Sequence, residues 1–101
     1  MAAQQISVLL VDDHEIVQAG YHRFLEKHAN IRIVAEAGDA EQGYQAYCDF
    51  QPDVSIIDLA LPGAGGLELI RRITTRDADA AMLVFSMHED ALFALRALDD
   101  G

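Results

Sequence analysis

Apolar residues gather in four short runs along the chain, each rich in Val, Ile, Leu or Met. The runs cover residues 6–11, 31–37, 53–58 and 80–85. Apolar runs of this length, bounded by turn residues, predict buried β-strands. The first run is continuously apolar, which is typical of a central strand covered on both faces.

Between these runs, apolar residues recur at the spacing of an amphipathic helix. A first helix is predicted from Ile16 to about Ala29-Asn30, with Asp12 or Asp13 as its cap. Its apolar positions are Ile16, Val17, Gly20, Tyr21, Phe24 and Leu25.

Three more helices are predicted along the rest of the chain. The second follows Asp39, with Gln42 completing a partial capping box, and ends near Phe50 because Pro52 blocks its extension. The third begins at Leu67 and carries Arg71, Arg72 and Arg76 toward its C-terminus, and the fourth runs from 89 to about 99. Four alternations of strand and helix predict an α/β fold, a doubly wound parallel sheet with helices on both faces.

Length and composition agree with one globular domain that spans residues 1–101. The chain carries 7 basic and 17 acidic side chains, a net charge of −10. This charge opposes direct binding to nucleic acid or to an acidic membrane surface. We see neither a signal peptide nor an apolar run near the roughly 20 residues of a membrane span, so we expect a cytoplasmic protein.

Polar groups stand at the carboxyl ends of three predicted strands. They are Asp12 and Asp13 after the first, Asp58 at the third and Ser86 after the fourth. These ends share one edge of a parallel sheet, so the side chains should converge. Two carboxylates about 5 Å apart repel by roughly 3 kcal/mol at an effective dielectric constant of 20, which favours a bound cation. Mg²⁺ suits such oxygen ligands, and a neighbouring carboxylate could act as a nucleophile.

Simpler readings exist for each residue alone. Asp before a helix is often only an N-cap, and Asp or Ser after a strand is often only a turn residue. The joint pattern at consecutive strand ends favours a site. His14 and His88 flank the same edge, and we interpret them as solvated rim residues rather than ligands of a transition metal.

Three segments together resemble the receiver domain of bacterial two-component response regulators. They are VLLVDDH (8–14), DLALPGAGGLEL (58–69) and LVFSMHED (83–90), with Ser86 lying 28 residues after Asp58 (86 − 58). The sequences of these motifs resemble those of the subfamily whose members carry a C-terminal helix-turn-helix DNA-binding domain. The resemblance implies a flavodoxin-like fold with strand order 2-1-3-4-5.

The resemblance also implies roles for the residues at the strand ends. Asp58 would accept a phosphoryl group from a sensor histidine kinase, and Ser86 would be the switch hydroxyl. Asp12, Asp13, Asp58 and the backbone carbonyl of Ala60 would hold Mg²⁺. Such a domain is a signalling switch rather than a turnover enzyme, and it would act on DNA only through an output domain.

The chain departs from the family pattern at its C-terminus. The family's fifth strand with its lysine, and the fifth helix, have no counterpart before Gly101. We therefore expect an incomplete receiver, with an uncovered apolar face on the first helix that favours a homodimer or other self-association. A degenerate receiver that only binds proteins is an alternative. An aspartyl phosphatase of the haloacid dehalogenase type is disfavoured, because it needs a second Asp where Ala60 stands.

Overall fold

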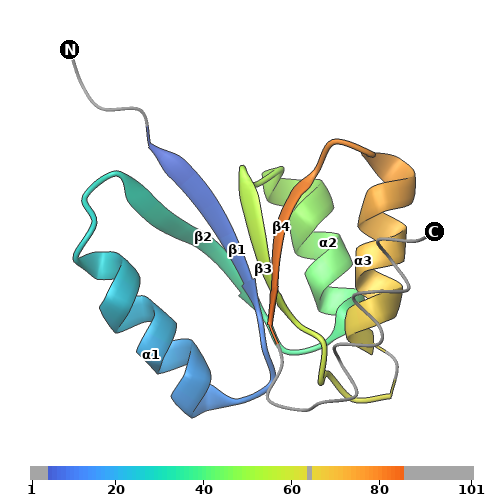
Figure 1. Ribbon diagram of the computed structural model, residues 1–101, viewed down its shortest axis with the longest axis horizontal. Coiled ribbons are helices and arrows are strands. Elements are labelled where there is room, and N and C mark those ends of the chain that lie inside the picture. Colours follow the sequence, from blue (N-terminus) through green and yellow to red (C-terminus); the bar gives the residue numbers. More distant parts are fainter. Residues whose placement is uncertain (1–4, 64, 86–101) are drawn as a thin grey trace.

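A computed structural model describes residues 5–63 and 65–85, which form a parallel sheet with helices on both faces (Figure 1). The strands are β1 (Ile6–Val11), β2 (Ile31–Ala37), β3 (Val54–Asp58) and β4 (Ala81–Phe85). All pairings are parallel, in the order β2-β1-β3-β4. The predicted fold class and the order of these four strands are confirmed. The predicted fourth helix, Ser86 and His88 lie outside the described residues.

The helices divide between the two faces of the sheet (Figure 1). Helix α1 (Glu15–Glu26) lies on one face, and α2 (Ala40–Phe50) and α3 (Gly65–Arg76) lie on the other. The larger core cluster joins the sheet to α2 and α3, and it is built from Leu9, Val11, Ala37, Tyr47, Ile57, Leu61, Leu69, Ile70 and Ile73. The smaller cluster, under α1, is Val8, Leu10 and Ile56. β1 contributes to both clusters, as the prediction of a central strand requires.

The predicted boundaries of α1 were wrong at both ends. The residue before the helix is His14, and no side chain caps it, because Asp12 Oδ1 instead accepts the His14 backbone N–H. The helix ends at Glu26, before the predicted Ala29. Two tight turns end it, as the His28 N–H bonds the carbonyl of Leu25 and the Ile31 N–H bonds that of His28.

The uncovered apolar face that was expected on the first helix is present. No residue of this helix is buried, and Ile16 and Phe24 are 87% and 61% exposed. Within the described part of the chain, no helix is long and apolar enough to cross a membrane.

Helix α2 follows its prediction closely. Asp39 Oδ1 accepts the Gln42 N–H at 2.7 Å, and Gln42 Oε1 accepts the Gly38 N–H at 3.3 Å. The helix ends at Phe50, two residues before Pro52. Helix α3 starts at Gly65, two residues earlier than predicted.

The pairing of β1 with β2 contains a register shift. Val8 pairs with Ile33, but Leu9 pairs with Ala35, so Val34 is an extra residue in β2. Beyond the shift, Leu10 faces Glu36 and Val11 faces Ala37. Ala37 therefore joins the larger core, and Glu36 bonds His22 of α1.

Candidate functional site

Three carboxylates meet at the carboxyl-terminal end of the sheet, at the lower edge of Figure 1. Asp12 and Asp13 follow β1, and Asp58 is the last residue of β3, the neighbouring strand. Together with His14 they each offer one ligand atom, and these atoms all lie within 4.8 Å of one another. The convergence that parallel strand ends predicted is therefore present.

Asp12 is fully buried and only half satisfied. Its Oδ1 accepts the His14 N–H at 2.8 Å, but its Oδ2 is buried and has no hydrogen-bond partner among the described residues. Its backbone is fixed, because its N–H donates to the carbonyl of Ala37 at 3.0 Å and its carbonyl accepts from the side-chain amide of Gln18. An oriented, unpartnered and buried carboxylate oxygen is the mark of a site that takes up another group.

Asp58 is also buried, at 3% exposure. Its Oδ1 accepts the Ala60 N–H at 2.8 Å, and the Leu59 N–H donates to the carbonyl of Phe85 on β4. Burial raises the pKa of the Asp58 carboxyl, the hydrogen bond from Ala60 opposes this, and the negative charges of Asp12 and Asp13 add to the rise. The site therefore holds Asp58 as a carboxylate that is destabilised at neutral pH.

Gly66 allows α3 to lie against the end of β3. A Cβ atom at this position would stand 2.5 Å from the Asp58 carbonyl oxygen and 2.6 Å from Leu59 Cα. Any side chain there would push on the backbone that carries the Asp58 carboxylate. The sequence showed a glycine-dense loop but gave no sign of which glycine is needed for close packing.

His14 lies at the rim of the carboxylate cluster, where its side chain is 61% exposed, in agreement with its interpretation as a solvated rim residue. Its Nδ1 is 3.0 Å from Asp13 Oδ1, 3.1 Å from Asp12 Oδ1 and 3.8 Å from Asp58 Oδ2. The hydrogen bond to Asp12, and then the charge of Asp13, raise the pKa of the imidazole. The ring covers the cluster from the solvent side. Its adjacency to Asp12 and Asp13 was the only signal in the sequence.

The donor set fits Mg²⁺. Carboxylate oxygens are the ligands that this ion prefers, and Asp12, Asp13 and Asp58 each offer one within 4.8 Å of the others. Ala60, whose carbonyl was predicted as a further ligand, is held beside the cluster by its own N–H bond to Asp58. Ser86, the predicted switch hydroxyl, lies outside the described residues.

Residues 8–101 match the family described as the response regulator receiver domain. The chain belongs to this family. Receiver domains are signalling domains rather than classical enzymes, and they generally bind Mg²⁺ at an acidic pocket. The acidic cluster stands where that pocket is expected.

Individual relatives agree with the family and with the predicted subfamily. A crystal structure of a LuxR-family two-component response regulator from Aurantimonas sp. SI85-9A1 is 43% identical, with a TM-score of 0.85, covering 97% of this chain and 70% of that one. The response regulator UvrY of Escherichia coli K12 is 36% identical over 96 residues, covering 95% of this chain and 44% of its own length. The isolated REC domain of RcsB from Salmonella enterica serovar Typhimurium, solved with phosphomimetic BeF₃⁻, is 28% identical with a TM-score of 0.83, covering 95% of this chain and 73% of that one.

The curated relatives are longer proteins. The chain spans about half the length of those it matches, from 40% to 45% for the regulators UvrY, LiaR, NarL and DegU. Their receiver part is therefore the part to which this chain is similar.

Proposed function

We propose that this chain accepts a phosphoryl group on Asp58 from a phosphohistidine of a sensor histidine kinase, with Mg²⁺ held by the acidic cluster. The observation that carries the proposal is the buried pair of carboxylates at adjacent strand ends, in which Asp12 Oδ2 has no partner among the described residues. A cluster built only for stability would satisfy its buried oxygens.

Asp58 is the nucleophile in this proposal, and it would also hold the ion together with Asp12, Asp13 and the Ala60 carbonyl. A carboxylate oxygen of Asp58 attacks the phosphorus atom, the new P–O bond forms, and the P–N bond to the kinase imidazole breaks. The electron pair of that bond stays on the imidazole nitrogen, which takes up a proton from solvent. Bound Mg²⁺ supplies positive charge that offsets the repulsion between the carboxylates and the incoming phosphate oxygens.

Two further residues act on the transferred group or on access to it. The Ser86 hydroxyl would donate a hydrogen bond to the phosphoryl oxygens. His14 contacts Asp12 and Asp13 through their Oδ1 atoms and covers the cluster from the solvent side, so movement of its ring would control access to Asp58. The acyl phosphate then shifts the surface of the domain between two states.

The partners follow from the same proposal. The kinase docks at the carboxyl-terminal end of the sheet, the domain works in the cytoplasm, and DNA is reached only through an output domain. The exposed apolar side chains of α1, Ile16 and Phe24 among them, favour a homodimer. Sedimentation velocity that shows a monomer at all concentrations would contradict the dimer and leave the phosphoacceptor role intact.

The test is chemical phosphorylation of the chain. Incubation with acetyl phosphate and Mg²⁺ should add the mass of one phosphoryl group, and Asp58→Asn or EDTA should abolish the gain. Asp53→Asn, which removes a carboxylate at the opposite end of the sheet, should leave the gain intact. A chain that gains no mass would instead support a receiver that acts only as a protein-interaction module.

A further inference from the structure

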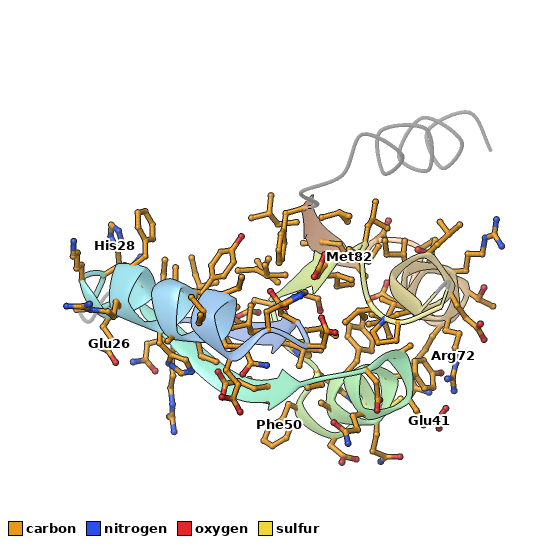
Figure 2. All side chains as sticks on the ribbon, turned by 90° about the horizontal axis from the view of Figure 1, so that it is seen from below. Glu26, His28, Glu41, Phe50, Arg72 and Met82 are labelled. Atoms are coloured by element: carbon orange, nitrogen blue, oxygen red, sulfur yellow. The ribbon has the colours of Figure 1, made fainter. Side chains whose placement is uncertain are left out.

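Helices α2 and α3 lie on the side of the sheet opposite α1 (Figures 1 and 2). A groove is lined by residues of these two helices. Its volume is about 510 Å³, and its lining residues are Tyr44, Leu67, Glu68, Arg71, Arg72 and Thr75. This volume is within the range of pockets that hold ligands or the side chains of a partner. None of these residues belongs to the acidic cluster.

Arginines gather on α3 although the molecule as a whole is acidic. Two of them, Arg71 and Arg72, line the groove together with one acidic residue, Glu68. Three of the seven Lys and Arg residues of the chain, Arg71, Arg72 and Arg76, stand within six residues on α3. The chain as a whole carries a net charge of −10. A positive strip on such a background concentrates the attraction for carboxylates along one surface.

The groove already holds a carboxylate from its own chain. Arg72 Nη1 donates to Glu41 Oε2 at 3.1 Å, and Figure 2 shows the two side chains on neighbouring helices. The Glu41 side chain is 84% exposed, whereas that of Arg72 is 35% exposed. An exposed ion pair contributes little stability, so another carboxylate can replace Glu41 at small cost.

An aromatic ring holds the arginine in place. The Arg72 guanidinium carbon lies 4.0 Å from the centroid of the Tyr44 ring, a cation–π geometry. Preorganised arginines lose little conformational entropy when they bind a planar carboxylate.

We propose that this groove binds an acidic peptide segment of a partner protein. An Asp or Glu carboxylate of the segment replaces Glu41 on Arg72, further acidic side chains pair with Arg71 and Arg76, and an apolar side chain packs on Leu67. Arg72, held against the Tyr44 ring, presents the planar guanidinium that pairs well with a carboxylate, and a single-stranded nucleic acid is the alternative that the test below separates from the peptide. The site is separate from the acidic cluster, and the proposal does not depend on phosphorylation of Asp58.

The experiment is an NMR titration of the ¹⁵N-labelled full chain with an oligoglutamate peptide that contains one leucine. Amide shifts should concentrate in α2 and α3 and shrink at high salt. The same peptide with glutamine in place of glutamate should leave the spectrum unchanged. Arg71→Gln and Arg76→Gln should each weaken binding by about twofold to fivefold, the range for one exposed ion pair.

Glu41→Gln gives the sharpest readout, because it removes the internal competitor. Binding should tighten by about twofold to fivefold, whereas a merely structural Glu41 would give no gain. Arg23→Gln on α1 is the control for the arginine variants, because it makes the same change in charge as Arg71→Gln on the other face and should leave the affinity unaltered. Dispersed amide spectra confirm that each variant is folded.

Three results would overturn the proposal. They are shifts spread over both faces of the sheet, equal loss of affinity in Arg23→Gln and Arg71→Gln, and stronger binding of a single-stranded oligonucleotide than of the peptide at the same residues. Failure here would leave the chemical phosphorylation of Asp58 untouched, so the two proposals fail separately.

Discussion

Carboxylates at the two ends of the sheet have opposite hydrogen-bonding environments. At the amino-terminal end, Asp53 Oδ2 accepts from the Ser7 N–H at 2.8 Å and from the Ser7 hydroxyl at 3.1 Å, and the Asp53 N–H donates to Ser7 Oγ at 2.9 Å. At the carboxyl-terminal end, Asp12 Oδ2 is buried without a partner among the described residues. The exposed carboxylate is the well-bonded one, and the buried carboxylate is not.

This difference distinguishes Asp53, whose hydrogen bonds stabilise the fold, from the acids of the cluster, for which we propose a function. The Ser7–Asp53 bonds join the start of β1 to the start of β3 and need nothing further. In the folded state, the carboxylates of the acidic cluster (Asp12, Asp13 and Asp58) repel one another. A proton, a bound cation or a chemical reaction at one of them lowers this repulsion. Removing a carboxylate charge should therefore raise stability at the carboxyl-terminal end and lower it at the amino-terminal end.

The largest effect is expected at Gly66, which supports the carboxyl-terminal end. Gly66→Ala places a Cβ atom 2.5 Å from the Asp58 carbonyl oxygen, and overpacking of this kind should lower the free energy of unfolding by about 2–3 kcal/mol. Gly20→Ala is the matched control, because nothing lies within 4 Å of its Cβ and it should stabilise α1 by about 0.5–1 kcal/mol. Urea unfolding measures both, and equal effects would contradict the close packing of α3 on β3.

Asp58→Asn should stabilise the metal-free chain by about 1 kcal/mol, because it removes one of three repelling charges. A carboxyl whose pKa is raised in the folded state lowers stability as the pH rises from the ordinary value of 3.8 through the raised one. The gain should therefore be complete at neutral pH and vanish in acid. Urea unfolding of both chains in EDTA, from acid to neutral pH, measures whether the variant gains or loses stability relative to the natural chain.

Adding Mg²⁺ should make the natural chain more stable than the Asp58→Asn variant. The ion binds the folded state of the natural chain and stabilises it by mass action, whereas Asp58→Asn offers one ligand fewer. If Mg²⁺ stabilised both chains equally, Asp58 would not belong to the metal site.

The smallest effect is expected from Asp53→Asn at the amino-terminal end. The amide oxygen still accepts a hydrogen bond, but it loses the charge that strengthens the bonds from Ser7, so stability should fall by about 0.5 kcal/mol. Mg²⁺ should act on this variant as on the natural chain. A gain in stability here would remove the contrast between the two ends.

Hydrophobic patterning was enough to predict the sheet and its end-on cluster of acids. The four apolar runs and the parallel topology bring Asp12, Asp13 and Asp58 to one edge, and no knowledge of side-chain packing is needed for that step. The family resemblance then supplied their roles, which the geometry alone does not distinguish.

What the sequence did not reveal depends on tertiary contacts. Asp53 and Asp58 look alike as acids that flank one strand, and only the distant Ser7 shows that Asp53 is satisfied. His14 turned toward the acids because the Asp12 side chain accepts its backbone N–H, a geometry that spacing does not encode. The uncovered apolar face of α1 was expected, but the sequence did not show which of its side chains is most exposed: Ile16 is 87% exposed and Phe24 is 61% exposed.

The extra residue in β2 determines which face of the sheet carries the negative charge of Glu36. If Val34 did not interrupt the pairing, Glu36 rather than Ala37 would lie opposite Val11, beneath Asp12 and on the side of α2. Glu36 would then lie on the same face of the sheet as Val11, and it would add a fourth carboxylate to this end of the sheet. The extra residue instead places Glu36 on the face that carries α1, where it bonds His22. A single extra residue in the strand therefore keeps this negative charge on the α1 face of the domain.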